Sequence, residues 1–126
     1  MPAAIDELTL TMTERELAKN VVHAAKTLGW RVYWTWNSLH SPRGWPDLVL
    51  LRGIDRGDPD LDWLWDLRGY PKTAIIFAEL KREKGKLTPD QEETLELLRG
   101  IDRPVYVWRP SNWLSGEIAE ILARNW

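Results

Sequence analysis

The sequence predicts a single α/β domain in which helices flank one mixed, four-stranded sheet. Two observations lead to this class. The chain has 126 residues, of which 44% are hydrophobic and 29% charged, a mixture that lets one domain bury a core. Its apolar segments also follow the order helix, three strands, helix, strand, helix. Neighbouring strands combined with one crossover helix are typical of an α/β layer fold.

The first helix is predicted from about Glu14 to Leu28. Thr13 and Glu16 have the spacing of a capping box, whose side chains bond the free amides at a helix start. Gly29 supplies the stop, since glycine tolerates the backbone conformation that ends helices. One apolar stripe recurs at helical spacing and is expected to be buried. It consists of Leu17, Val21, Ala24 and Leu28.

Three strands are predicted next. Residues 31–36 are aromatic and β-branched, which favours a first strand, and residues 47–51 form a short apolar second strand. The most apolar run, residues 74–78, predicts a central third strand that continues through Glu79 and Lys81. Between the second and third strands, residues 53–72 hold three Gly, two Pro and five Asp. We expect this insertion to have no regular structure.

The C-terminal third of the chain predicts a helix, a strand and a final helix. Thr88 and Gln91 form a second capping box, with proline at the first helical position, and Gly100 ends this helix. Pro104–Trp108 is the fourth strand. A terminal helix follows Gly116.

Composition excludes several classes of protein. With no cysteine, the chain has no disulfide, thiolate zinc site or cysteine nucleophile. No apolar stretch approaches the roughly 18 residues that span a bilayer, and the N-terminus lacks the basic start of a signal peptide. We therefore expect a cytoplasmic protein with no membrane partner. The net charge of −2 argues against a polycationic nucleic-acid coat but allows a local basic patch.

Acidic and basic residues gather where the second and third strands would meet. If these strands pair antiparallel, Asp47 at the start of one lies beside Glu79 at the end of the other. Glu79 and Lys81 share a strand face because they are two residues apart, while Leu80 points into the core. Two carboxylates can hold Mg²⁺, which polarises a phosphate and activates a bound water, and a lysine can orient that water. The pattern indicates phosphodiester hydrolysis.

These residues resemble a known family. The Pro46-Asp47 dipeptide, the triplet of residues 79–81 and the αβββαβ order resemble the PD-(D/E)XK nuclease superfamily. Three blocks resemble its VRR-NUC branch more narrowly: Gly44-Trp45-Pro46-Asp47-Leu48, Glu79-Leu80-Lys81 with Gly85 and Leu87, and Pro89-Asp90-Gln91. The likeness spans about residues 14–113. It implies one nuclease domain over residues 1–126, with a core at about 13–113 and an insertion at about 53–72.

The resemblance also implies roles for individual residues. Asp47, Glu79 and the backbone carbonyl of Leu80 become ligands of Mg²⁺ or Mn²⁺, and Lys81 becomes the catalytic lysine. The family places a further Glu on the first helix. Glu14 extends the buried stripe and is preferred for this role, whereas Glu16 already serves the capping box.

Other positions have competing interpretations. A capping box alone explains Gln91, but its helix face and the family both indicate a place in the site. The family often has Gln where this chain has Ala18. The basic loop residues Lys84, Lys86 and Arg82, together with Arg43, are expected to contact DNA phosphates, although most charge runs are solvated turns.

Two other aspartates also follow proline. Asp90 falls in the first turn of a helix, where the helix dipole explains a carboxylate. Asp60 lies in the insertion, without a strand to hold it in place. Asp47 is therefore preferred. Trp63 and Trp65, also in the insertion, are expected at an interface, whereas the tryptophans on strands are expected in the core.

Three functions compete. The leading one is a Mg²⁺- or Mn²⁺-dependent DNA endonuclease. By the resemblance, it acts as a homodimer on branched, junction or flap DNA in a bacterial or phage-infected cell. The second is an inactive nuclease-like module that binds DNA or protein, but packing alone does not require three charged groups at one strand end. The third, a Trp-rich carbohydrate-binding module, predicts no metal site.

Overall fold

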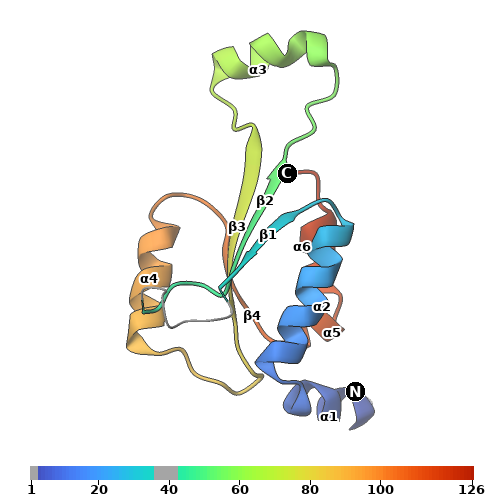
Figure 1. The fold of residues 1–126 in the computed structure, drawn as a ribbon, viewed down its shortest axis with the longest axis vertical. Coiled ribbons are helices and arrows are strands. Elements are labelled where there is room, and N and C mark those ends of the chain that lie inside the picture. Colours follow the sequence, from blue (N-terminus) through green and yellow to red (C-terminus); the bar gives the residue numbers. More distant parts are fainter. Residues whose placement is uncertain (1–2, 36–42) are drawn as a thin grey trace.

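A computed structural model describes residues 3–35 and 43–126 and shows a mixed four-stranded sheet (Figure 1). The strands lie in the order β1 (Arg31–Trp34), β2 (Leu48–Gly53), β3 (Thr73–Leu80) and β4 (Val105–Trp108). β2 pairs antiparallel with both β1 and β3, and β3 pairs parallel with β4. The predicted α/β class and the antiparallel pairing of the second and third strands are confirmed.

Helices cover both faces of this sheet. On one face lie α2 (Glu14–Thr27), α5 (Pro110–Leu114) and α6 (Glu117–Ala123), and on the other lies α4 (Pro89–Arg99), as Figure 1 shows. The main core lies between the sheet and helices α2 and α6 and includes Leu17, Leu50 and Trp108. Within the described residues, no helix is long and apolar enough to cross a membrane.

Helix α2 begins and ends close to the predicted residues. The Thr13 hydroxyl accepts a hydrogen bond from the Glu16 amide at 3.1 Å, and Gly29 follows the helix with a φ of 88°. The buried face is broader than the predicted stripe, and Leu28 is exposed because it lies beyond the last helical residue. The buried side chains are Leu17, Ala18, Val21, Val22 and Ala25.

Outside the insertion, the described residues include two helices that were not predicted. Helix α1 (Ala3–Thr11) precedes the capping box of α2. Helix α5 follows β4 directly and places Pro110 at its first position. Proline suits this position, because an amide N–H there would have no partner within the helix. Helix α5 has only five residues, too few for a hydrophobic period to reveal it.

The insertion is more regular than expected. β2 runs through Gly53, which pairs with Thr73, so the excursion begins at Ile54. It then forms a 3-10 turn, η2 (Pro59–Leu61), and a helix, α3 (Asp62–Arg68). We call residues 54–72 the arm because they project from the end of the sheet (Figure 1).

The prediction that residues 53–72 lack regular structure is therefore wrong. Local signals stabilise the arm. The Asp58 carboxylate accepts the Asp60 amide at 2.9 Å, and Gly69 ends α3 with a φ of 74°. The Trp65 and Tyr70 rings then pack edge to face at 5.2 Å.

The strand ends also differ slightly from the prediction. β1 ends at Trp34, and Trp36, the predicted end of the first strand, lies outside the described residues. β2 begins at Leu48 rather than at Asp47. β3 ends at Leu80, although the Lys81 amide still donates to the Trp108 carbonyl at 3.0 Å. Asp47 and Lys81 thus stand just beyond the regular ladder.

Candidate active site

The register of β2 and β3 brings Asp47 to the end of β3. Leu48 pairs with Ala78, so the next position outward sets Asp47 opposite Glu79. The Asp47 Oδ2 atom accepts a hydrogen bond from the Leu80 amide at 2.8 Å. On its other side, the Asp47 carbonyl accepts the Thr35 amide at 2.9 Å. Asp47 is therefore fixed between two neighbouring segments.

Glu79 is a buried acid with an incomplete set of hydrogen bonds. Its residue is 2% exposed. The Oε1 atom accepts from the Gln91 amide nitrogen at 3.0 Å, whereas buried Oε2 has no partner among the described residues. Burying a carboxylate oxygen without a donor is costly. The site is therefore poised to take a proton or a cation at Oε2.

The surroundings favour the neutral form of Glu79. Burial, followed by the negative charge of Asp47, raises the pKa of Glu79 from 4.5 to about 9. A proton on Glu79 supplies the donor that two carboxylates otherwise lack. The Lys81 ammonium acts in the opposite direction, and Glu14 adds a smaller upward effect. Two carboxylates in contact need a proton or a cation between them.

Lys81 lies beside this carboxylate pair. It is 9% exposed, an unusual degree of burial for lysine. Glu79 and Lys81 extend from the same side of the strand, while Leu80 joins the opposite core. A buried ammonium needs negative charge nearby, and the charge of Lys81 acts on Glu79 against the rise in the pKa of that acid.

Glu14, not Glu16, is the acid of α2 that acts on Glu79. Glu14 is exposed at the first position of α2, yet its charge contributes to the raised pKa of Glu79. Glu16 accepts the Thr13 hydroxyl at 3.1 Å, as expected for a capping residue. Ala18, where the family often has Gln, is buried and brings no polar atom to the site.

Gln91 serves both of the roles that its position indicates. Its Oε1 atom accepts the Thr88 amide at 2.9 Å and completes the capping box of α4. Its Nε2 atom donates to Glu79. The two ends of one amide therefore tie the start of α4 to the carboxylate, and α4 holds Glu79 in place.

Gly44 is a positioning residue that sequence reasoning used only as part of a motif. Its φ is +81°, and a side chain there would overlap the carbonyl of Asp90. The segment before Asp47 therefore passes directly over the start of α4. The adjoining Trp45 packs edge to face on Phe77 at 6.0 Å, and Pro46 is fully buried. In the sequence, a glycine followed directly by tryptophan and proline is the feature that could have indicated this contact.

The alternative aspartates lie outside the site. Asp60 is exposed in the arm, and Asp90 is exposed in the first turn of α4. The four basic residues proposed for DNA are also exposed, and none forms an ion pair with another described residue. They are Arg43, Arg82, Lys84 and Lys86.

The carboxylate oxygens at this site suit a hard cation that few protein atoms hold. Among the described residues, no group of three or more His, Asp or Glu side chains lies close enough to hold a metal ion. Asp47 and Glu79 nevertheless bring two carboxylates together, and Oε2 of Glu79 lacks a partner. Mg²⁺ is commonly bound by one or two carboxylates and keeps several waters. The two carboxylates fit such an ion.

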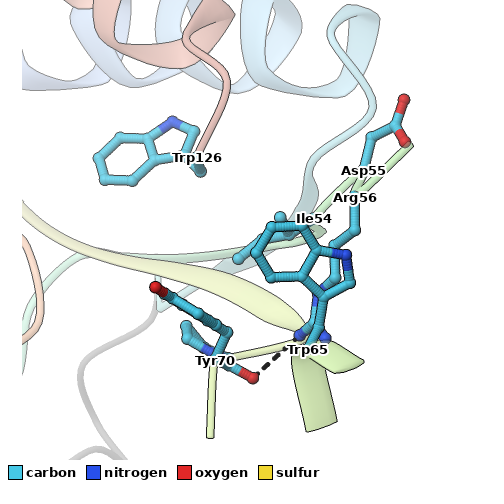
Figure 2. A pocket seen from close by; sticks show the side chains of 7 residues that line it. Ile54, Asp55, Arg56, Trp65, Tyr70 and Trp126 are labelled. Atoms are coloured by element: carbon cyan, nitrogen blue, oxygen red, sulfur yellow. Dashed lines mark hydrogen bonds between the residues drawn. The ribbon is translucent and has the colours of Figure 1, made fainter. Parts of the chain in front are cut away.

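The arm borders a separate cavity of about 330 Å³ (Figure 2). Aromatic rings of Trp65, Tyr70 and Trp126 line it, and Arg56 donates to the Tyr70 carbonyl at 3.0 Å. Arg56 also pairs with Asp66 at 3.7 Å. This cavity adjoins the far ends of β2 and β3, away from Asp47 and Glu79, and does not contain the carboxylate pair.

Comparison of the chain with protein-family models, curated proteins and solved structures yields no match.

Proposed function

We propose that this protein is a divalent-metal-dependent DNA endonuclease of the PD-(D/E)XK type, resembling the VRR-NUC branch. One observation carries the proposal: a buried Glu79, with a free carboxylate oxygen, contacts Asp47 across two antiparallel strands. Lys81 follows on the same strand face and is also buried. Folding gains little from burying an acid and a lysine beside a second carboxylate, so a chemical role explains these residues better.

Each residue has a role in this proposal. Asp47 and Glu79, with the Leu80 carbonyl, hold Mg²⁺ or Mn²⁺, and Glu14 adds negative charge from α2. A bound ion would supply a Lewis acid for the phosphate and lower the pKa of a water. Lys81 orients the attacking water and offsets charge that develops on the phosphate. Gln91 keeps the Glu79 carboxylate oriented.

The substrate and assembly are further parts of the proposal. Arg82, Lys84, Lys86 and Arg43 contact the DNA backbone, and the resemblance favours branched, junction or flap DNA. A second copy of the chain, docked through the arm, completes a homodimer. The cytoplasm of a bacterial or phage-infected cell is the proposed location.

An inactive nuclease-like module is the second candidate. The exposed position of Glu14 favours it, because the described residues offer no third carboxylate close enough to complete a cage. The carbohydrate-binding alternative needs a platform of exposed tryptophans; Trp30 and Trp108 are buried, whereas Trp45 and Trp63 are exposed on separate segments.

A cleavage panel tests the proposal. Single-stranded, duplex, flap and four-way-junction DNA are incubated with the protein in Mg²⁺, Mn²⁺ or EDTA, with Glu79→Gln alongside. We expect cleavage of at least one substrate only with metal and only by the unmodified protein. Cutting that persists in EDTA would contradict the metal site. DNA binding without cutting under every condition would favour the inactive module.

A further inference from the structure

The loop that carries the basic residues is held by an arginine outside the predicted site. We call residues 82–86 the cationic loop. The Arg109 Nη1 atom donates to the carbonyls of Arg82 at 2.7 Å, Gly85 at 2.6 Å and Glu83 at 3.2 Å. One guanidinium nitrogen thus contacts three carbonyls of a five-residue segment.

A second contact joins the cationic loop to the same part of the chain. The Glu83 Oε2 atom accepts the Ser111 amide at 2.9 Å. Arg109 itself is fixed, because its amide donates to the Asn112 Oδ1 atom at 2.8 Å at the start of α5. The cationic loop is therefore attached to the junction of β4 and α5 through both Arg109 and Glu83.

Among the described residues, the cations of the loop form no ion pair. Carbonyls rather than a carboxylate satisfy Arg109, so no ion pair among the described residues neutralises its guanidinium. The one acid of the loop, Glu83, is occupied by the Ser111 amide. Lys84 and Lys86 are exposed on either side of Gly85. A preformed loop of this kind loses less conformational entropy on meeting a charged ligand.

We propose that Arg109 is a positioning residue that fixes the cationic loop, so that Lys84 and Lys86 each meet a phosphate of the DNA backbone beside Glu79 and Lys81. This inference rests on the proposed function. The loop starts one residue after Lys81, so its place relative to the carboxylates depends on how it is held. Arg109 would then determine how the DNA backbone is aligned with the carboxylates.

The salt dependence of DNA binding tests this role. Four proteins carry Glu79→Gln to prevent cleavage: the parent, Arg109→Gln, Lys84→Ala/Lys86→Ala, and the combination of all three changes. Each phosphate contact contributes about 0.9 to the slope of log Kd against log salt. We expect the Lys84→Ala/Lys86→Ala change to lower this slope by about 1.8. Arg109→Gln should lower it by at least half as much. The combined variant should have the same slope as the variant with the two lysine changes alone.

Two results would overturn the positioning role. An unchanged slope in Arg109→Gln would mean that Arg109 only stabilises the fold. Additive losses in the combined variant would mean that Arg109 contacts a phosphate itself. Arg103→Gln is the matched control, because Arg103 is an exposed arginine that bonds only its neighbour's carbonyl among the described residues.

Trypsin provides a readout that does not depend on DNA, since it cuts after Arg82, Lys84 and Lys86. We expect Arg109→Gln to be cut in the loop about tenfold faster than the parent, with Arg109→Lys intermediate and Arg103→Gln unchanged. Lack of DNA binding by the parent would refute the proposed function and the phosphate contacts, while faster cutting of the loop would still support Arg109 as its holder. Unchanged loop cutting in a folded Arg109→Gln protein would refute the holding role.

Discussion

At the level of single residues, burial sets the protonation state of Glu79. The pKa of this acid is raised from 4.5 to about 9, so between these values the folded state binds more protons than the unfolded chain. The free energy of unfolding must then fall as the pH rises through that window. Burial of this acid therefore costs stability at alkaline pH, a cost that the proposed metal site would explain.

Glu79→Gln should therefore be more stable than the natural protein at alkaline pH. Glutamine stays neutral, so the loss of stability with pH disappears. In EDTA we expect a melting temperature higher by at least about 4 °C at pH 8, the shift that roughly 1 kcal/mol gives a small domain, and little difference at pH 4.5. Circular dichroism melts check this, with exposed Glu93→Gln as the control. An equal difference at both pH values would contradict the raised pKa.

A pair of aspartate variants distinguishes Asp47 from Asp60, which also follows a proline. Asp47→Asn should lower metal-dependent cleavage by roughly a hundredfold or more, the scale of a lost electrostatic group, because Asp47 contacts both Glu79 and the Leu80 amide. Asp60→Asn should keep most activity, since Asp60 is exposed in the arm. Both are assayed on the same DNA after their melting temperatures are compared. Loss in Asp60→Asn with retention in Asp47→Asn would reverse the assignment.

At the level of elements, the approach of one loop to α4 fixes the start of β2. Gly44→Ala should be destabilising by a few kcal/mol, because the methyl group would overlap the Asp90 carbonyl and alanine is strained at a φ of +81°. Gly57→Ala is the matched control, as Gly57 has a φ of +83° with open space around it. Urea unfolding measures both. Equal losses would show that backbone strain, not the contact with α4, explains Gly44.

Elements with strong local signals could be predicted from the sequence. The capping boxes of α2 and α4 gave their starts, and the run of apolar residues gave β3, because these signals act within a few residues. Helix α3 could not be found in this way, since its seven residues are too few to show a hydrophobic period. Short elements depend on their neighbours for stability.

The site was predictable in part. The prediction that Asp47 lies beside Glu79 depended on an antiparallel pairing of the second and third strands, and β2 and β3 do pair in this way. That Gln91 fills both of its roles at once depends on how closely α4 approaches β3, and the sequence does not give this distance. The contacts of Arg109 with the cationic loop join residues more than twenty positions apart, and no spacing in the sequence signals them.

At the level of the whole molecule, the arm exposes apolar side chains, which the proposed homodimer would bury. Trp63 is 62% exposed and Leu67 is 77% exposed, and residues four apart share a face of a helix. Trp65, also expected at an interface, instead packs against Tyr70 within the arm. Trp63 is therefore the better anchor for a contact between copies.

Trp63→Glu should shift the protein from dimer to monomer. Light scattering at high micromolar concentration measures the mass, and Leu97→Glu is the matched control, because Leu97 is 71% exposed on α4 rather than on the arm. A natural protein that is monomeric at that concentration and still cuts DNA would contradict dimerisation. Disruption by Leu97→Glu alone would move the interface to α4.

The central claim is that Asp47 and Glu79 hold a divalent cation, and calorimetric titration with Mn²⁺ and Mg²⁺ tests it most directly. We predict one saturable site in the natural protein and in Asp60→Asn, and loss of that site in both Glu79→Gln and Asp47→Asn. Binding that is absent from the natural protein, or that survives unchanged in both of the latter variants, would contradict the account.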